Sequence, residues 1–365
     1  MFSETIDITL RCNTEEAHYL KYNKQENQCF EFKHSTSSHI IDDLKNEYAI
    51  LTFLHNHSIK VKRPICFTEN NSSFTAKYQY IPGDSLSNMM MLERYGLMDI
   101  DLKMKCYIAL FLTTVIQKCH KIGFIITLLS PECIKIDKYY FIYIDSLDNG
   151  TSNSQITYSS TVLNQRYCSK DYQIFKDPDI DSCNTFDESV DSYWFGVLLF
   201  SLFYKIDVAE HMKNNSKQYH CVKNLLFSNF TSDKKLDQPF YHEMKSLIGK
   251  LLDSVKKERC TIHQFKSDFL KLIDKYADSM EIDANFKEWQ ENGERSKLNQ
   301  ENLDLLRDLE ECCLLGFIEP SYLLAKISLF MNNTNMSNLL FQRCIDIQNE
   351  IGKNLFYDID NYYES

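Results

Sequence analysis

Glycine, proline and tryptophan are scarce in this chain of 365 residues, which has 9, 6 and 2 of them. No glycine precedes Gly83, which excludes a glycine-rich loop that brings backbone amides close to a phosphate in the N-terminal part. No apolar run approaches the roughly 20 residues that span a bilayer, and the N-terminus lacks the basic and apolar regions of a signal peptide. The patterns of a P-loop, a zinc protease and a serine hydrolase are also missing. We therefore expect no membrane span and none of these three chemistries.

The 13 cysteines include no Cys-x-x-Cys pair, and their number is odd. Disulfide scaffolds and zinc sites normally show even counts or paired spacing. We therefore expect cysteine to serve as a small buried apolar residue in a reducing compartment, which predicts a cytoplasmic location.

Acidic residues outnumber basic ones by 51 to 40, which gives a formal net charge of -11. This balance argues against a nucleic-acid-binding surface over the whole molecule. The hydrophobic share of 44% and the charged share of 25% are ordinary for a globular protein. The length allows two or three compact units. We expect partners that are proteins rather than nucleic acids.

The first 80 residues have the apolar periodicity of strands around one helix. Apolar and polar side chains alternate in short segments, which is typical of half-buried strands, and one longer segment has apolar residues on a single helical face. The patterns predict a helix at residues 40–56 and strands at residues 6–10, 29–33, 60–67 and 74–80.

Beyond residue 84 the periodicity is mostly helical. It predicts helices at residues 102–121, 191–206, 241–254 and 261–276, with a brief strand at 135–144. The polar stretch 148–190 has few periodic apolar positions and predicts a long loop. A strand-rich N-terminal part followed by a helical part is an α+β arrangement.

The acidic stretch 276–297 predicts a linker, followed by a helical extension over residues 298–365. Within it we expect helices at 298–315, 320–332 and 335–349. Residues 316–325 are similar to one helical hairpin of a Sel1 or tetratricopeptide repeat. A single repeat cannot bury its own faces, so a helical extension packed on the preceding domain is an equally good interpretation.

Four acidic or basic positions follow one another in a distinctive order. Lys33 ends the predicted strand Phe30-Glu-Phe-Lys33, and Glu47 lies in the next helix. Asp145 ends the segment Phe141-Ile-Tyr-Ile-Asp145, and Asp191-Ser-Tyr-Trp-Phe-Gly196 opens a long apolar helix. This order and spacing resemble the eukaryotic protein kinase-like superfamily. The resemblance covers residues 1–275 and implies a two-lobed protein kinase-like fold, with an N-lobe of about 1–82 and a C-lobe of about 83–275.

The resemblance implies a nucleotide site built from five residues. Lys33 matches the lysine that holds the α- and β-phosphates, and Glu47 matches the glutamate that pairs with it. Tyr78 matches the gatekeeper, where it would narrow the pocket behind the adenine, and Tyr80 lies in the hinge segment. Asp145 matches the aspartate that binds a metal ion. ATP and Mg²⁺ are thus the cofactors that the family would use.

The resemblance also implies structural roles for three residues of the second lobe. Asp191 would be buried and would accept hydrogen bonds from the backbone of the catalytic loop. Gly196 lies in the same helix. Arg259 matches an arginine that pairs with a glutamate at the end of the activation segment.

The catalytic groups themselves are missing. The family's catalytic His, Arg, Asp and Asn positions are occupied by Ile126, Thr127, Leu128 and Cys133. Leu128 cannot accept a proton, and loss of a general base alone typically lowers the rate by roughly 10²–10⁴-fold. Residues 11–19, where the phosphate loop would lie, contain two glutamates that would repel a triphosphate. We therefore expect a pseudokinase without cofactor, acting as a protein-binding scaffold or an allosteric regulator.

Two alternatives remain open at this stage. The first is a divergent ATP-dependent phosphotransferase with weak activity that uses Lys33, Glu47 and Asp145. The second is a helical-repeat interaction protein unrelated to kinases, which predicts helix rather than strand at residues 29–33, 74–80 and 139–144.

Overall fold

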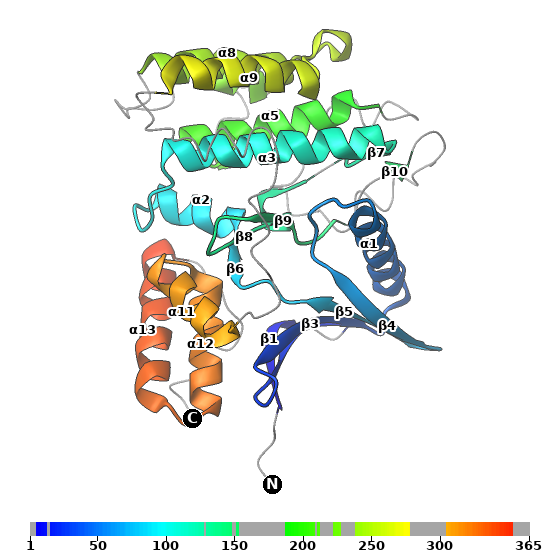
Figure 1. The fold of residues 1–365 in the computed structure, drawn as a ribbon, viewed down its shortest axis with the longest axis vertical. Coiled ribbons are helices and arrows are strands. Elements are labelled where there is room, and N and C mark those ends of the chain that lie inside the picture. The colour runs from blue at the N-terminus through cyan, green and yellow to red at the C-terminus, as the bar shows by residue number, and fades with distance from the viewer. Residues whose placement is uncertain are drawn as a thin grey trace. The chain divides into compact units, whose positions relative to one another are not determined.

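An N-terminal five-stranded antiparallel sheet precedes a mostly helical region, so the fold is α+β (Figure 1). The computed structural model describes residues 5–12, 15–127, 129–147, 151–152, 187–208, 210–211, 222–227, 238–277 and 304–352. The chain forms two units, which are described separately. Unit 1 comprises Met1–Met98, Glu132–Asp148 and Asn299–Ser365, and unit 2 comprises Asp99–Pro131 and Asn149–Leu298.

The main sheet of unit 1 has the strand order β1-β2-β3-β5-β4. Its pairing register aligns Ile8, Leu20, Glu31 and Tyr78 across four neighbouring strands. Aligned residues share one face of a sheet, and all four are buried. We call this face the inner face. The strands are β1 (Thr5–Cys12), β2 (Glu16–Asn23), β3 (Gln28–Ser35), β4 (Pro64–Asn70) and β5 (Ser73–Gln79).

Helix α1 (Ser38–Asn56) packs against β3, β4 and β5. Leu44, Glu47, Leu51 and Leu54 are buried, and their spacing of three and four residues places them on one side of the helix. This periodicity directs Glu47 toward the sheet.

A second sheet of unit 1 has the order β6-β8-β9, with β6 at Gly83–Ser85, β8 at Ile134–Asp137 and β9 at Ile142–Ile144. Gly83 is required here because a Cβ would lie 2.3 Å from the carbonyl oxygen of Ile136. Helix α2 (Leu86–Arg94) follows β6 directly. The segment before β4 joins this sheet through a parallel bridge between Val61 and Ile144.

The single strand predicted at 135–144 is wrong, because the segment is a hairpin of β8 and β9. The carboxylate of Asp137 accepts hydrogen bonds from the backbone amides of Tyr139 and Phe141, at 2.8 and 2.9 Å. Tyr140 has a φ of 63°, so the chain reverses there. The alternating aromatic residues Tyr139, Phe141 and Tyr143 favoured one continuous strand. The turn at Asp137 divides that segment into two strands.

Three helices at the C-terminal end belong to unit 1: α11 (Leu305–Leu314), α12 (Ile318–Phe330) and α13 (Thr334–Ile351). We call them the C-terminal helices. They lie beside β1 (Figure 1), and α12 contacts it. They share one apolar cluster with the sheet, which includes Ile8, Leu20, Tyr22, Cys29, Leu309, Tyr322, Leu323 and Phe341. Helices α12 and α13 begin and end within two residues of the predicted bounds. The first helix was predicted to begin at residue 298, but α11 begins at Leu305, and residues 298–303 lie outside the described residues. The shared cluster shows that the three helices pack on the sheet.

Unit 2 is built around α5 (Ser189–Tyr204), which is buried on nearly all sides. A Cβ at Gly196 would lie 3.0 Å from side-chain atoms of Leu251 and Leu252, so glycine allows the close approach of α8. The other elements are α3 (Leu102–Lys121), β7 (Phe124–Ile125), β10 (Thr151–Ser152), α7 (Val222–Phe227), α8 (Pro239–Leu251) and α9 (Ile262–Tyr276).

The strands expected at 29–33 and 74–80 are present as parts of β3 and β5. The helical-repeat alternative, which predicted helix there, is therefore wrong on this point. Among the residues described above, no helix has the length and apolar character to cross a membrane. Most of the predicted loop 148–190 and nearly all of the predicted linker 276–297 lie outside the described residues.

Candidate functional site

The Lys33 ammonium lies 2.7 Å from the carboxylate of Glu47. Lys33 is two residues beyond Glu31 on β3, so strand alternation places it on the inner face. Glu47 reaches it from the buried side of α1. The sequence predicted this ion pair, and the structure contains it.

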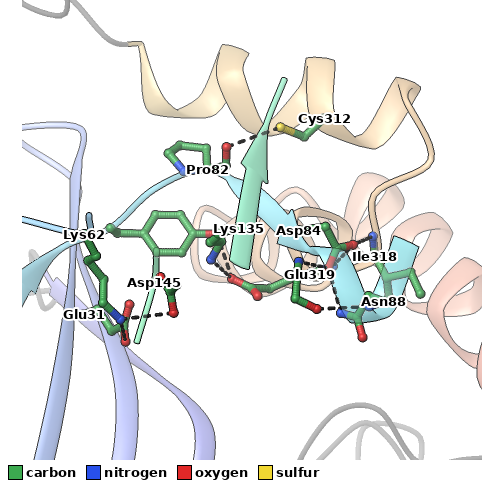
Figure 2. A network of polar contacts seen from close by, with 12 residues as sticks. Glu31, Lys62, Pro82, Asp84, Asn88, Lys135, Asp145, Cys312, Ile318 and Glu319 are labelled. Atoms are coloured by element: carbon green, nitrogen blue, oxygen red, sulfur yellow. Dashed lines mark hydrogen bonds and ion pairs between the residues drawn. The ribbon is translucent and has the colours of Figure 1, made fainter. Parts of the chain in front are cut away.

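A second lysine, Lys62, lies deeper in unit 1. Its side chain is 0% exposed, and its ammonium lies 2.6 Å from Glu31 and 3.2 Å from Asp145. It also lies 4.9 Å from the centre of the Tyr78 ring, within the range of a cation–π interaction. Figure 2 shows Lys62 directed at both carboxylates. The aspartate that sequence reasoning assigned to a metal ion is thus paired with a protein cation.

Backbone hydrogen bonds hold this cluster in place. The amide of Lys62 donates to the carbonyl of Ile144 at 2.7 Å, and the amide of Ile144 donates to the carbonyl of Lys60 at 3.1 Å. The next amide along β9, that of Asp145, donates to the carbonyl of Cys133 at 2.8 Å. These backbone hydrogen bonds fix the positions of Lys62, which precedes β4, and Asp145, which directly follows β9.

Burial and neighbouring charges shift the pKa values of Glu31 and His18 in this cluster. Burial alone would raise the pKa of Glu31, but Lys62 and His18 outweigh it and hold that pKa well below its usual value. Burial lowers the pKa of His18, and the nearby Lys33 and Lys62 lower it further against the opposing effect of Glu31. Since His18 is then neutral at pH 7, two lysines face the three carboxylates of Glu31, Glu47 and Asp145.

A third buried lysine, Lys135 on β8, pairs with Glu319 in the first turn of α12 at 2.5 Å. The Tyr80 hydroxyl donates to the same carboxylate at 3.3 Å, and the Lys135 ammonium lies 4.7 Å from the Tyr80 ring centre. Tyr80 was predicted to lie beside a nucleotide. In this structure its hydroxyl and ring contact Glu319 and Lys135.

Glu319 and Lys135 influence each other's protonation. Burial raises the pKa of Glu319 to about 7, with Asp84 adding to the rise and Lys135 opposing it. For Lys135, the attraction of Glu319, Asp145 and Glu31 exceeds the effect of burial, so its pKa is raised. Lys135 therefore remains charged at all ordinary pH values, while Glu319 titrates near neutrality.

In unit 2, Asp191 organises the segment that contains Ile126 and Thr127. Its carboxylate accepts hydrogen bonds from the backbone amides of Ile126 and Thr127 at 3.1 and 2.8 Å. The indole of Trp194 donates to it at 2.9 Å, and a ring nitrogen of His120 lies 2.7 Å away. The predicted hydrogen bonds from this backbone to Asp191 are present.

Thr127 has a φ of 65°, which is an outlier for a β-branched residue. Its buried hydroxyl has no hydrogen-bond partner among the described residues. Leu128, the residue at the catalytic aspartate position, lies outside the described residues.

Arg259 is buried, and among the described residues its guanidinium contacts two backbone carbonyls and an aromatic ring. Its guanidinium donates to the carbonyl of Asp253 at 2.7 Å and to that of Ser189 at 3.4 Å, and it lies 5.2 Å from the Tyr193 ring centre. The segment expected to provide its glutamate partner lies outside the described residues. The observed contacts tie Arg259 to the start of α5.

Sequence reasoning missed Lys62, Lys135 and Glu319. Nothing in the sequence around Lys62 marks it as buried. Lys135 had a weak signal, because it stands between two isoleucines in a short apolar strand where a lysine is unusual. Glu319 could be linked to the site only by a contact between residues 184 positions apart.

No family model matches this chain, and no curated protein matches it. Among the described residues, no group of three or more His, Cys, Asp or Glu side chains is arranged to hold a metal ion.

Proposed function

We propose that this chain is a degenerate member of the eukaryotic protein kinase-like superfamily, a pseudokinase that serves as a protein-binding scaffold or an allosteric regulator. The proposal is supported by two arrangements that the family motifs implied. One is the ion pair between Lys33 and Glu47, and the other is the set of backbone hydrogen bonds to Asp191. The α+β arrangement of the described residues agrees with it. A cytoplasmic location and a protein partner are parts of the same proposal.

The contact between Lys62 and Asp145 carries the argument against catalysis. A divalent metal bound to Asp145 would lie about 2.0–2.1 Å from a carboxylate oxygen. The Lys62 ammonium already lies 3.2 Å from that group and is fully buried. Repulsion between a divalent ion and a lysine about 4 Å away is on the order of 8 kcal/mol at an effective dielectric constant near 20. The position of Lys62 therefore disfavours a divalent ion on the oxygen of Asp145 that it contacts.

The residues at the catalytic positions support the same conclusion. Phosphoryl transfer depends on a positioned base and on metal ions that neutralise the developing charge. Leu128 and Cys133 supply neither a base nor a hard oxygen ligand. What remains is the folded framework, which offers surfaces for other proteins.

A divergent phosphotransferase is the second candidate, and the Lys33–Glu47 pair agrees with it as well. In that case Lys62 would have to leave Asp145 before a metal ion could bind. The pair alone does not distinguish the candidates, because it also stabilises α1 against the sheet.

A phosphotransfer assay tests the proposal. The full chain is incubated with radiolabelled ATP, Mg²⁺ or Mn²⁺ and a general protein substrate, beside the Asp145→Asn variant. We expect no label transfer above the level of Asp145→Asn with either metal. Transfer by the unmodified chain that disappears in Asp145→Asn would overturn the proposal and favour the second candidate.

A further inference from the structure

The C-terminal helices cover the same face of the sheet that carries the candidate site. Ile8 and Leu20 belong to the apolar cluster shared with these helices. The strand register aligns both residues with Glu31, which binds Lys62. Since aligned residues share a face, the helices and the charged cluster lie on one side of the sheet.

The first turn of α12 supplies a charged group to the site. The carboxylate of Glu319 contacts the Lys135 ammonium and the Tyr80 hydroxyl. Lys135 is 5% exposed, so its ammonium has little water to replace a lost partner. A buried charge without a partner is strongly unfavourable. The Glu319 carboxylate is therefore the main neutralising partner of Lys135.

Two further polar contacts join the same parts of unit 1. The carboxylate of Asp84 accepts a hydrogen bond from the backbone amide of Ile318 at 2.6 Å. The Lys138 ammonium contacts carboxylate oxygens of both Asp308 and Glu311 on α11, each at 2.5 Å. Figure 2 shows two neighbouring groups of polar contacts, one that joins Glu31, Lys62 and Asp145 and one that joins Lys135 and Asp84 to the start of α12.

We propose that the C-terminal helices are an intramolecular ligand of the candidate site, with Glu319 as the carboxylate that Lys135 and Tyr80 bind. The helices occupy the sheet face beside Glu31 and Lys33 and close it to a nucleotide. This inference rests on the proposed function, because that function assigns the nucleotide role to this face. The site therefore binds the acidic first turn of α12, a helix of the same chain.

Cysteine labelling in the intact chain tests the inference. Cys29 lies on the sheet side of the shared apolar cluster, Cys344 lies on its helix side, and both are buried. Cys106 and Cys119 are buried in unit 2 and report on global unfolding. Labelling rates under native conditions are measured residue by residue by mass spectrometry. We expect Glu319→Lys to raise the rates at Cys29 and Cys344 at least tenfold and to leave Cys106 and Cys119 within twofold.

Two variants complete the design. Glu350→Lys makes the same charge change at an exposed position of α13 and should leave all rates within twofold. The double variant Lys135→Glu with Glu319→Lys restores an ion pair and should return the rates at Cys29 and Cys344 to within threefold of the unmodified chain. Because Glu319→Lys could unfold the chain, Glu319→Gln is measured as well, with an expected increase of several-fold at the same two residues.

The inference is overturned if Glu319→Lys and Glu350→Lys give the same rates. It is also overturned if both the Lys and the Gln variants raise the rates in units 1 and 2 equally, because the helices would then not open as a local ligand. Phosphotransfer by the intact chain would overturn the proposed function, but it would leave the dependence of the cysteine rates on Glu319 unchanged. The two failures are therefore distinguishable.

Discussion

The Asp84 carboxylate, at the centre of β6, accepts a hydrogen bond from the backbone amide of Ile318 at 2.6 Å and so caps α12. Phe317, the N-cap residue of α12, provides no side-chain hydrogen bond. The same carboxylate also accepts the Ser85 amide at 2.9 Å and the Asn88 side chain at 2.7 Å. Asp84, 234 positions earlier in the chain than Ile318, therefore caps the N-terminus of α12 in place of a local N-cap side chain.

Replacing Asp84 by Ala is expected to lower the free energy of unfolding by about 2–3 kcal/mol, because buried amide groups lose their acceptor. Asp84→Asn retains an acceptor oxygen and should lower it by about 1 kcal/mol. Asp101→Ala, which removes an ordinary cap from α3, is the control, with an expected loss of about 1 kcal/mol. Urea denaturation measures all three. If Asp84→Ala and Asp101→Ala lowered the free energy of unfolding equally, Asp84 would contribute no more than an ordinary helix cap.

Lys62→Met is expected to destabilise the protein by about 3–5 kcal/mol, because it leaves Glu31 and Asp145 without their buried cation. Adding Glu31→Gln should recover about half of the loss, since one uncompensated charge is removed. The matched control is Lys45→Met, which breaks an exposed pair with Glu69 and should change stability by less than about 1 kcal/mol. If the Lys62 and Lys45 variants were equally stable in denaturant titrations, the buried cluster would not have the charges assigned to it.

Stability should depend on pH through Glu319. Its pKa is raised from 4.5 to about 7 in the folded protein, so between these values the folded state holds a proton that the unfolded state has released. Stability from this group is therefore greatest below pH 4.5 and declines as the pH rises to about 7, by roughly 2–3 kcal/mol. The charged and titratable groups around it include Asp84, Lys135 and Asp145.

Glu319→Gln removes this titration, and its unfolding free energy should decline less between pH 4.5 and 7.5 than that of the unmodified chain. The variant also lacks the carboxylate that contacts Lys135, so the informative quantity is the slope of the unfolding free energy with pH and not its value at one pH. Denaturant unfolding at a series of pH values measures it. Parallel curves for the two proteins would contradict a raised pKa at Glu319.

Thr127→Gly is expected to stabilise the protein by about 1 kcal/mol. The substitution relieves a positive φ in a β-branched residue, worth about 1–2 kcal/mol, and removes a buried hydroxyl with no partner among the described residues. The loss of a buried methyl group and the added flexibility of glycine offset part of this gain. Ile126→Gly is the control, because Ile126 is fully buried and has no positive φ. The melting temperature should rise for Thr127→Gly and fall for Ile126→Gly. A lower melting temperature in both variants would contradict backbone strain at Thr127.

Local patterns were sufficient to predict much of the fold. Alternation identified β3 and β5, and apolar spacing identified α1, α3 and α5. The Lys33–Glu47 pair was predicted from the resemblance to the kinase-like superfamily, and the structure contains it. The hairpin of β8 and β9 was missed because the Asp137 turn interrupts an aromatic alternation that continues beyond it.

The contacts that distinguish this site depend on long-range pairing. Lys62 meets Asp145 only because Val61 pairs with Ile144, and no periodicity encodes that bridge. Glu319 reaches Lys135 because α12 packs on β1 and β6. A sequence pattern specifies the face of an element but not its distant partner, which is why the acidic first turn of α12 was not connected to the site.

The most direct test of the central claim is a titration of the full chain with ATP and Mg²⁺, followed by thermal unfolding. Ligand binding to the folded state raises the melting temperature by mass action. With Lys62 on Asp145 and the C-terminal helices on the inner face, we predict no shift at millimolar nucleotide, in the unmodified chain or in Lys33→Met. A saturable upward shift that Lys33→Met abolishes would contradict the claim, because it would show a nucleotide site that the protein's own groups do not fill.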